Sequence, residues 1–270
     1  MKIGFVSFII PYYNAGATIQ ETMDSIFNQS YPHFDVWIVN DGSTDSLSIE
    51  KLKDFEGNNR IHILHQENAG PSVARNKAIS QTMAEFIVPL DADNLICKDS
   101  ITLSLHYFVN DKNLSAVYGN FKCFGESTFL KRLMPFDENK SLIYNQIDTC
   151  AILRKFIFDG IIEYDVTLSK LGLEDWEFWL NFHNLGLKSK YIDITFFEFR
   201  ISSNSRTFKV ANNNLNEIKR IIIEKHHKMV FDQHVKLYYQ KKQLLETPDY
   251  RIGNFLLKPY RWVKRLLIRK

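Results

Sequence analysis

Asp91 and Asp93 are separated by one residue, and this spacing suits them to bind a ligand together. They follow an apolar run at residues 86–90, which predicts a buried strand. In an extended segment, residues i and i+2 project to the same side, so both carboxylates can face one ligand. Two close carboxylates repel each other unless a cation neutralises them, and Mg²⁺ is often held by one or two carboxylates with substrate phosphates. The pair therefore predicts a divalent-cation site. A solvated turn before a helix is the plainer alternative.

Polar or turn-forming residues follow each of four predicted strands. The strands are short apolar runs at residues 6–10, 36–39, 61–64 and 86–90. The segments after them are residues 11–14, 40–45, 67–70 and 91–93. In an open parallel sheet, ligands bind beyond the carboxyl ends of the strands. Any one of these loops is ordinary turn chemistry. Four of them on one sheet edge predict a binding site.

Helix-like segments separate these strands. Thr18 and Glu21 have the spacing of a capping box, and Pro71 stands where a first-turn proline is tolerated. Strands alternating with helices, without a hairpin signal, predict an α/β fold with a doubly wound, mostly parallel sheet flanked by helices. Beyond about residue 114 the alternation breaks. The expected elements there are an irregular loop over the site at residues 125–147, a helix beginning near Glu174, and a long charged helix at residues 214–246.

Composition excludes several classes of protein. The chain has 270 residues, of which 45% are hydrophobic and 24% charged, so disorder is excluded. The chain contains no run of eighteen apolar residues, so no membrane span is predicted. The N-terminus lacks the pattern of a signal peptide. The three cysteines are odd in number and form no C-x-x-C pair, which favours a reducing, cytoplasmic compartment.

The net charge of +3 is concentrated at the C-terminus. Residues 250–270 carry seven basic residues and no acidic one, which leaves the rest of the chain with 27 basic against 31 acidic residues. That balance gives no reason to expect nucleic-acid binding. Apolar residues 262, 263, 266 and 267 share a helical stripe beside basic residues, which predicts contact with an anionic membrane surface. A tail packed on its own domain, or on a partner copy in a homodimer, is the alternative.

Five segments resemble the family 2 glycosyltransferases, which are nucleotide-sugar-dependent enzymes of the GT-A fold. Residues 6–14, 38–45, 68–76 and 91–93 occur in family order and spacing, and residues 172–179 resemble the acceptor-side Glu-Asp block. The resemblance covers about residues 1–200. It implies a GT-A domain at residues 1–210, with a nucleotide-sugar half at about 1–95 and an acceptor half at about 96–210. A C-terminal helix and a basic amphipathic tail at residues 211–270 would follow.

The resemblance also implies roles for single residues on the donor side. Tyr13 would stack on the nucleobase, Asp41 would accept the N3–H of a uracil, and Arg75 would reach the diphosphate. Asp93, with Asp91, would bind Mg²⁺ or Mn²⁺. The nucleotide-sugar contacts implied together are Pro11, Tyr13, Asn14, Asp41, Gly70, Arg75, Asp91 and Ala92.

On the acceptor side, the resemblance implies that Asp175 is the general base and Glu174 its helper. A helix N-terminus would lower the pKa of Asp175 and keep it ionised. The plainer alternative is a pair of carboxylates that only cap the helix. Trp176 and Trp179 are expected to pack or to line the acceptor pocket.

The implied function is a metal-dependent, inverting glycosyltransferase that uses a UDP-linked sugar. Its acceptor would be a glycan or lipid-linked hydroxyl, in cell-surface polysaccharide synthesis at the inner face of the membrane. A catalytically silent nucleotide-sugar-binding module is one alternative. A metal-dependent nucleotidyltransferase is another, although residues 11–17 lack the lysine that its phosphate loop would need. The match also departs from the family at Asn40, where Asp is common, and at residues 199–206, which lack a histidine. Arg200 or Arg206 would compensate there.

Overall fold

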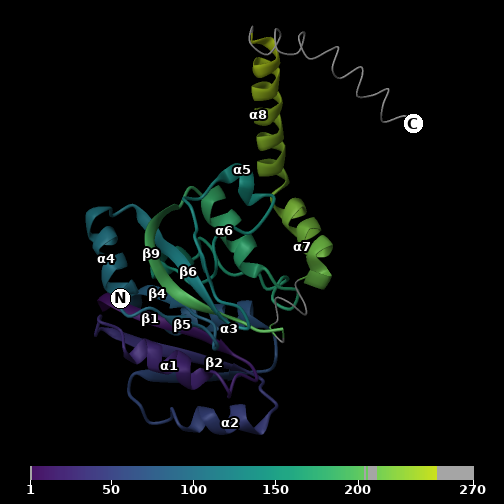
Figure 1. The fold of residues 1–270 in the computed structure, drawn as a ribbon. Coiled ribbons are helices and arrows are strands. Elements are labelled where there is room, and N and C mark those ends of the chain that lie inside the picture. Colours follow the sequence, from purple (N-terminus) through teal and green to yellow (C-terminus); the bar gives the residue numbers. More distant parts are fainter. Residues whose placement is uncertain (1, 204, 206–211, 248–270) are drawn as a thin grey trace. The chain divides into compact units, whose positions relative to one another are not determined.

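The computed structural model describes residues 2–203, 205 and 212–247 (Figure 1). The chain divides into two units, Met1–Ile222 and Ile223–Lys270. Within the described residues, no helix combines the length and the apolar composition that a membrane span requires. The predicted amphipathic tail and Arg206 lie outside the described residues.

The first part of the chain alternates strands and helices as predicted. Its elements are β1 (Lys2–Tyr12), α1 (Ile19–Phe27), β2 (Phe34–Asp41), α2 (Ser46–Lys53), β3 (Ile61–Gln66), α3 (Pro71–Gln81) and β4 (Ala84–Pro89). The four strands are parallel and lie in the order β3-β2-β1-β4. All four therefore end at the same edge of the sheet, which is the arrangement that a shared binding edge requires.

The second part adds strands in both directions. Its elements are β5 (Leu95–Ile96), α4 (Ser100–Asn110), β6 (Leu114–Gly125), β7 (Phe129–Lys131), α5 (Glu138–Ser141), β8 (Ile152–Arg154), the 3₁₀ helix η1 (Lys155–Phe158), α6 (Glu174–Asn184) and β9 (Lys188–Ile201). The sheet continues from β4 through β8, β6 and β9 to β5. Strand β8 is antiparallel to both β4 and β6, whereas β6 and β9 are parallel. Strands β6 and β7 pair antiparallel across a turn of three residues, in the part of the chain where the predicted alternation ends.

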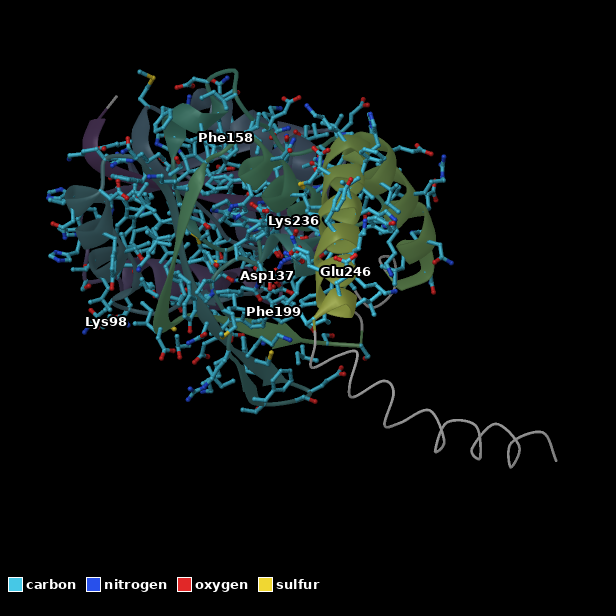
Figure 2. All side chains as sticks on the ribbon, turned by 90° about the horizontal axis from the view of Figure 1, so that it is seen from above. Lys98, Asp137, Phe158, Phe199, Lys236 and Glu246 are labelled. Carbon is cyan, nitrogen blue, oxygen red and sulfur yellow. The ribbon has the colours of Figure 1, made fainter. Side chains whose placement is uncertain are left out.

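Helices cover both faces of the sheet, α1 and α4 on one and α3 and α6 on the other. Side chains fill the space around the sheet (Figure 2). Successive residues of a strand point to opposite faces. In β1, Phe8 and Ile10 accordingly pack in one core cluster with residues of α1 and α4, whereas Ile9 packs in the other with residues of α3 and α6. Both faces of β1 are therefore buried, which fits its nearly continuous apolar sequence.

Two helix predictions need correction. Helix α1 begins after Thr18 as expected, but the Thr18 side chain makes no cap, and its hydroxyl instead donates to the carbonyl of Ala92 at 2.9 Å. The capping box is therefore wrong, and Thr18 ties the loop after β1 to the loop after β4. The single helix expected at residues 214–246 is two helices, α7 (Asn212–Lys225) and α8 (His227–Glu246).

Candidate active site

The loops after β1 and β2 are joined through Asn14. Its side-chain oxygen accepts hydrogen bonds from the backbone N–H groups of Thr44 (2.8 Å) and Asp45 (3.3 Å), and its own N–H donates to the Ser43 hydroxyl at 3.0 Å. Asn14 has φ +50°, in the left-handed region that asparagine tolerates better than most residues. Two of the four predicted loops therefore form one connected surface.

Asp41 shapes the loop after β3. Its carboxylate is buried and accepts three hydrogen bonds of 2.8 Å, from the Gln66 amide and from the backbone N–H groups of Ala69 and Gly70. Gly70 has φ +89°, and a Cβ there would lie 2.4 Å from the Ser169 hydroxyl, so only glycine fits. In this structure the Asp41 carboxylate holds the loop after β3, and contact with a uracil remains a prediction.

The remaining donor-side residues differ in exposure. Tyr13 leaves 48% of its surface exposed beside the Asn14 loop, so its ring is accessible for stacking. Pro11 is the register partner of Val39, within the paired part of β1 and β2. Ala92 is buried between the two candidate metal-binding aspartates.

Arg75 bridges the two halves of the molecule. Its guanidinium is 2% exposed and donates from Nη2 to Asp91 Oδ1 at 2.6 Å and from Nη1 to Glu174 Oε1 at 2.8 Å. Its guanidinium carbon also lies 5.3 Å from the ring centre of Tyr164. The expectation that Arg75 reaches out to a diphosphate differs from this geometry, because both terminal nitrogens are engaged by carboxylates. Arg75 instead fixes the start of α6 against the loop after β4.

Asn76, the next residue on α3, strengthens the same junction. Its side-chain amide donates to the carbonyl of Tyr164 at 2.8 Å, and its oxygen accepts from the backbone N–H of Tyr164 at 3.0 Å. A side chain that replaces a backbone partner in both directions holds the facing segment in a single register.

The cation site predicted at Asp91 and Asp93 consists of two carboxylates. Burial and the charge of Asp91 raise the pKa of Asp93 to about 6, and Arg200 opposes the shift. Arg200 lies close by, since its Nε donates to the Asp93 carbonyl at 3.0 Å. No group of three or more His, Cys, Asp or Glu side chains in the described part of the chain is arranged to hold a metal. Two mutually repelling carboxylates fit a Mg²⁺ or Mn²⁺ ion that takes its other ligands from phosphates and water.

Helix α6 begins at Glu174 as predicted, and the chain enters it through an unusual turn. Gly172 has φ +98° and Leu173 has φ +56°. A leucine in the left-handed region costs on the order of 1–3 kcal/mol and persists only where its surroundings enforce it. This turn points Glu174 towards Arg75, and it lies directly before Asp175.

Asp175 is held by two hydrogen bonds. Its Oδ2 accepts from the amide of Asn145 at 2.6 Å, and its Oδ1 accepts from the backbone N–H of Trp176 at 3.0 Å. Burial and the neighbouring charge of Glu174 raise its pKa to about 7. The expectation of a pKa lowered by the helix N-terminus is therefore wrong, because burial beside a second carboxylate outweighs the dipole. A carboxylate with a pKa near 7 suits a general base at neutral pH.

Residues 7–162, more than half of the chain, match the sequence family described as Glycosyl transferase family 2. The chain belongs to this family. Its alignment with the structure of S. aureus TarS residues 1–349 in complex with UDP-GlcNAc has a TM-score of 0.65 at 19% identity, over 81% of this chain and 65% of TarS 1–349. The predicted GT-A fold is confirmed.

Named relatives of this glycosyl transferase family 2 chain include synthases of polysaccharides. The Pasteurella multocida chondroitin synthase is 39% identical over 118 residues, which are 43% of this chain and 12% of the synthase. The Staphylococcus epidermidis poly-β-1,6-N-acetyl-D-glucosamine synthase is 32% identical over 133 residues, which are 49% of this chain and 32% of that protein. The chain therefore spans at most a third of the length of either synthase.

Two site residues of this family member were not anticipated from sequence. Asn145 contacts Asp175, and Asp148 lies close enough for its pKa to rise to about 8, through burial and the charges of Asp175 and Asp91. Asn145 stands near the end of the stretch expected to cover the site, residues 125–147, and Asp148 directly follows that stretch. Polar residues just before a buried strand were the available signal. Trp176 and Trp179 are buried, as expected for packing residues.

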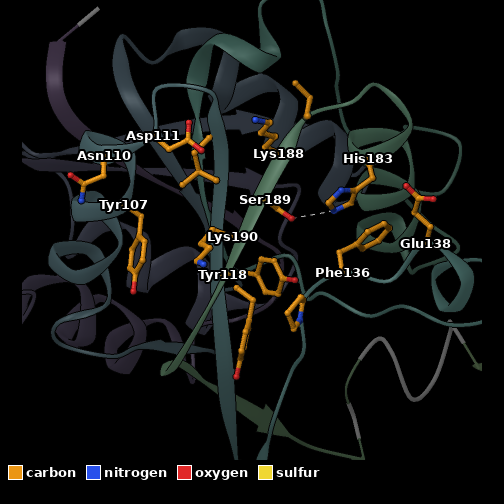
Figure 3. Close-up of a pocket in the computed structure, with 14 residues that line it drawn as sticks. Tyr107, Asn110, Asp111, Tyr118, Phe136, Glu138, His183, Lys188, Ser189 and Lys190 are labelled. Carbon is orange, nitrogen blue, oxygen red and sulfur yellow. Dashed lines mark hydrogen bonds between the residues drawn. The ribbon is translucent and has the colours of Figure 1, made fainter.

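A separate cavity of about 650 Å³ lies at the other end of the sheet (Figure 3). It is lined by the starts of β6 and β9 and the ends of α4 and α6, including Asn110, His183 and Lys188. It shares no residue with the group around Arg75 and Asp175, so it is not the candidate active site.

Proposed function

We propose that this chain is an inverting glycosyltransferase that transfers a sugar from a UDP-linked donor to a hydroxyl of a glycan or lipid-linked acceptor. The Arg75 bridge carries the proposal, because one buried guanidinium contacts both the loop of the candidate cation site and the helix that bears Asp175. UDP is favoured because TarS structures of the same fold contain UDP and UDP-GlcNAc.

The donor would lie along the carboxyl edge of β1, β2 and β4. The exposed ring of Tyr13 suits stacking on a base, and the loop tied by Asn14 would lie beneath the nucleoside. Asp91 and Asp93 would hold Mg²⁺ or Mn²⁺ with the diphosphate. When bound, the ion would supply positive charge that stabilises the leaving diphosphate.

Asp175 would act as the base. The proton of the acceptor hydroxyl passes to its carboxylate, while the hydroxyl oxygen attacks the anomeric carbon from the face opposite the diphosphate. The bond from that carbon to the phosphate oxygen breaks, and UDP leaves with the electron pair. Glu174 is a poorer candidate for the base, because its ion pair with Arg75 stabilises its ionised form without freeing it to take a proton.

The biological setting that we propose is cell-surface polysaccharide synthesis at the inner face of the membrane. The named synthases among the relatives support it, and so does the basic amphipathic sequence of the C-terminal tail. Co-sedimentation with acidic liposomes tests the membrane part. Deleting residues 255–270 should abolish binding, and unchanged binding would remove the tail from the proposal.

A screen of UDP- and GDP-sugars for nucleotide release, with UDP-GlcNAc included, tests the activity directly. We expect UDP release from at least one UDP-sugar and loss of that release in Asp175→Asn. A donor that binds but is never cleaved, even with glycan acceptors present, would instead indicate a catalytically silent sugar-nucleotide-binding module.

A further inference from the structure

Residues 141–148 lie against the first turns of α6, and we call them the strap. The indole N–H of Trp176 donates to the carbonyl of Ser141 at 2.5 Å, and that of Trp179 donates to the carbonyl of Asp148 at 3.0 Å. Both indoles are buried. Helix α6 therefore fixes both ends of the strap by contacts that do not depend on its middle.

Asn145 stands in the middle of the strap and contacts Asp175, the proposed base, in the first turn of α6. Its Nδ2 donates to Asp175 Oδ2 at 2.6 Å. Its other amide atom, Oδ1, is buried and has no hydrogen-bond partner within the described part of the chain. Leaving a buried acceptor without a partner has a cost in free energy. The amide tolerates that cost in the orientation that donates to Asp175.

We propose that Asn145 is the positioning residue of the base, whose amide holds one carboxylate oxygen of Asp175 so that the carboxylate stays ionised and faces the acceptor. This inference rests on the proposed function. An amide suits the task because it donates a hydrogen bond without carrying a charge. A lysine or arginine in its place would stabilise the carboxylate so strongly that it could no longer take a proton at neutral pH.

The charges around Asp175 explain why a neutral donor is needed. Glu174 on the same helix, Asp148 on the strap and Asp91 beyond it are acidic, and Tyr164 also lies close. Arg75 is the cation among the groups that act on Asp175, and it is already paired with two carboxylates. The Asn145 amide therefore adds to the stabilisation of ionised Asp175 that Arg75 provides, and its hydrogen bond has the larger effect of the two.

A double-mutant cycle on unfolding tests the contact without any substrate. The variants are Asn145→Leu, which keeps the volume and removes the donor, Asp175→Ala, and their combination, measured in urea at pH 8.5 and pH 5.5. We expect the two sites to be coupled by about tenfold in the unfolding equilibrium constant at pH 8.5. At pH 5.5 we expect about threefold, because a hydrogen bond to a neutral carboxyl is roughly half as strong. Asn145→Ala replaces the leucine variant if that one does not fold.

The pH profile of UDP release tests the consequence for the base. The coupling is expected to be about threefold stronger with the ionised carboxylate than with the neutral one. Losing it in Asn145→Leu should therefore raise the pKa of Asp175 by about half a unit and move the acid limb of kcat/KM to higher pH by the same amount. Gln146→Ala is the matched control. It breaks two hydrogen bonds between Gln146 and Asp137 without touching Asp175, and it should leave the limb in place.

Coupling below about twofold at pH 8.5 would overturn the inference, and so would an equal shift of the acid limb in Gln146→Ala. If the unmodified chain releases no UDP from any donor, the proposed function fails. The unfolding cycle still decides in that case whether Asn145 holds Asp175.

Discussion

The proposed donor edge of the site consists of the loops after β1, β2 and β3, and the proposed acceptor edge consists of residues 141–148 and the start of α6. The two edges hold their carboxylates in opposite ways. On the donor edge, Asp41 accepts hydrogen bonds from backbone N–H groups of the loop after β3, and Asp45 accepts one from the backbone N–H of Ser48. Hydrogen bonds from the hydroxyl and backbone N–H of Ser48 lower the pKa of Asp45. On the acceptor edge, Asp148 and Asp175 are crowded together, and burial raises the pKa of both.

Under the proposed function, this difference separates donor binding from the reaction. Carboxylates satisfied by backbone donors make rigid loops, which is what recognition of a nucleotide requires. Carboxylates crowded in a poorly solvated place are less stable as anions and therefore better at taking a proton. In the proposed function, the crowded carboxylates of the acceptor edge lower stability and increase reactivity, and Arg75 limits the loss of stability by pairing with Asp91 and Glu174.

The largest expected effect comes from removing that compensation. Arg75→Met leaves Asp91 and Glu174 without their shared cation, and the Glu174 carboxylate is buried. We expect a loss of about 3–5 kcal/mol in the free energy of unfolding, measured by urea denaturation.

The donor edge provides the comparison for Arg75→Met. Asp41→Asn exchanges an acceptor oxygen for an NH₂ group that faces N–H donors, and it should cost about 1–3 kcal/mol. An equal or greater cost for Asp41→Asn would contradict the view that the ion pairs of Arg75 contribute more to stability than the hydrogen bonds that satisfy Asp41.

Asp175→Asn should have the next largest effect, on turnover rather than on folding. We expect sugar transfer to fall by about 10²-fold or more, with UDP affinity unchanged, because the donor loops are built without Asp175. Glu174→Gln should cost less in turnover, since it keeps a hydrogen-bond acceptor for Arg75. Transfer assays beside UDP titrations measure both effects. Near-normal turnover in Asp175→Asn with a dead Glu174→Gln would mean that the two roles are reversed.

The donor half of this comparison could be read from sequence, because its signals are local. The strands of the first part, the first-turn proline at Pro71 and the loops after β1 to β4 all lie in short segments with recognisable patterns. Parallel topology then brings the loops to one edge without any further information.

The acceptor half could be read only in part, because its contacts join distant residues. The start of α6 at Glu174 was predictable, but Arg75 pairs with a residue 99 positions away, and Asn145 contacts Asp175, 30 positions away. The pKa of Asp175 was predicted with the wrong sign, because the sequence indicates a helix N-terminus but does not show the burial that surrounds it.

The pH dependence of stability sharpens the comparison further. The pKa of Asp175 is about 7 in the folded chain, above the roughly 3.9 expected when unfolded. The unfolded chain therefore releases this proton first, and the native state loses stability as pH rises from about 4 to about 7. Asp175→Asn removes that loss and should be about 1–3 kcal/mol more stable than the unmodified chain at pH 8, with little difference near pH 4.

Urea denaturation across this pH range measures the difference. Asp45→Asn is the matched control on the donor edge. Because the pKa of Asp45 is lowered, its ionised form stabilises the fold above about pH 4, and the control should be less stable than the unmodified chain at pH 8. If Asp175→Asn is also destabilised at pH 8, the acceptor edge holds its carboxylate as the donor edge does, and the contrast between the two edges fails.

The smallest expected effect concerns Asp91 and Asp93, which lie between the two edges. Their carboxylates would repel a diphosphate unless a cation stands between, so UDP should bind about tenfold more tightly with Mg²⁺ or Mn²⁺ than with EDTA. Uridine is the control, because it lacks phosphates and should bind equally in both conditions. Asp93→Asn should reduce this difference in UDP affinity, because it should weaken UDP binding with metal and strengthen UDP binding in EDTA. Calorimetric titration measures each affinity, and equal affinity for UDP with and without metal would remove the cation from the mechanism.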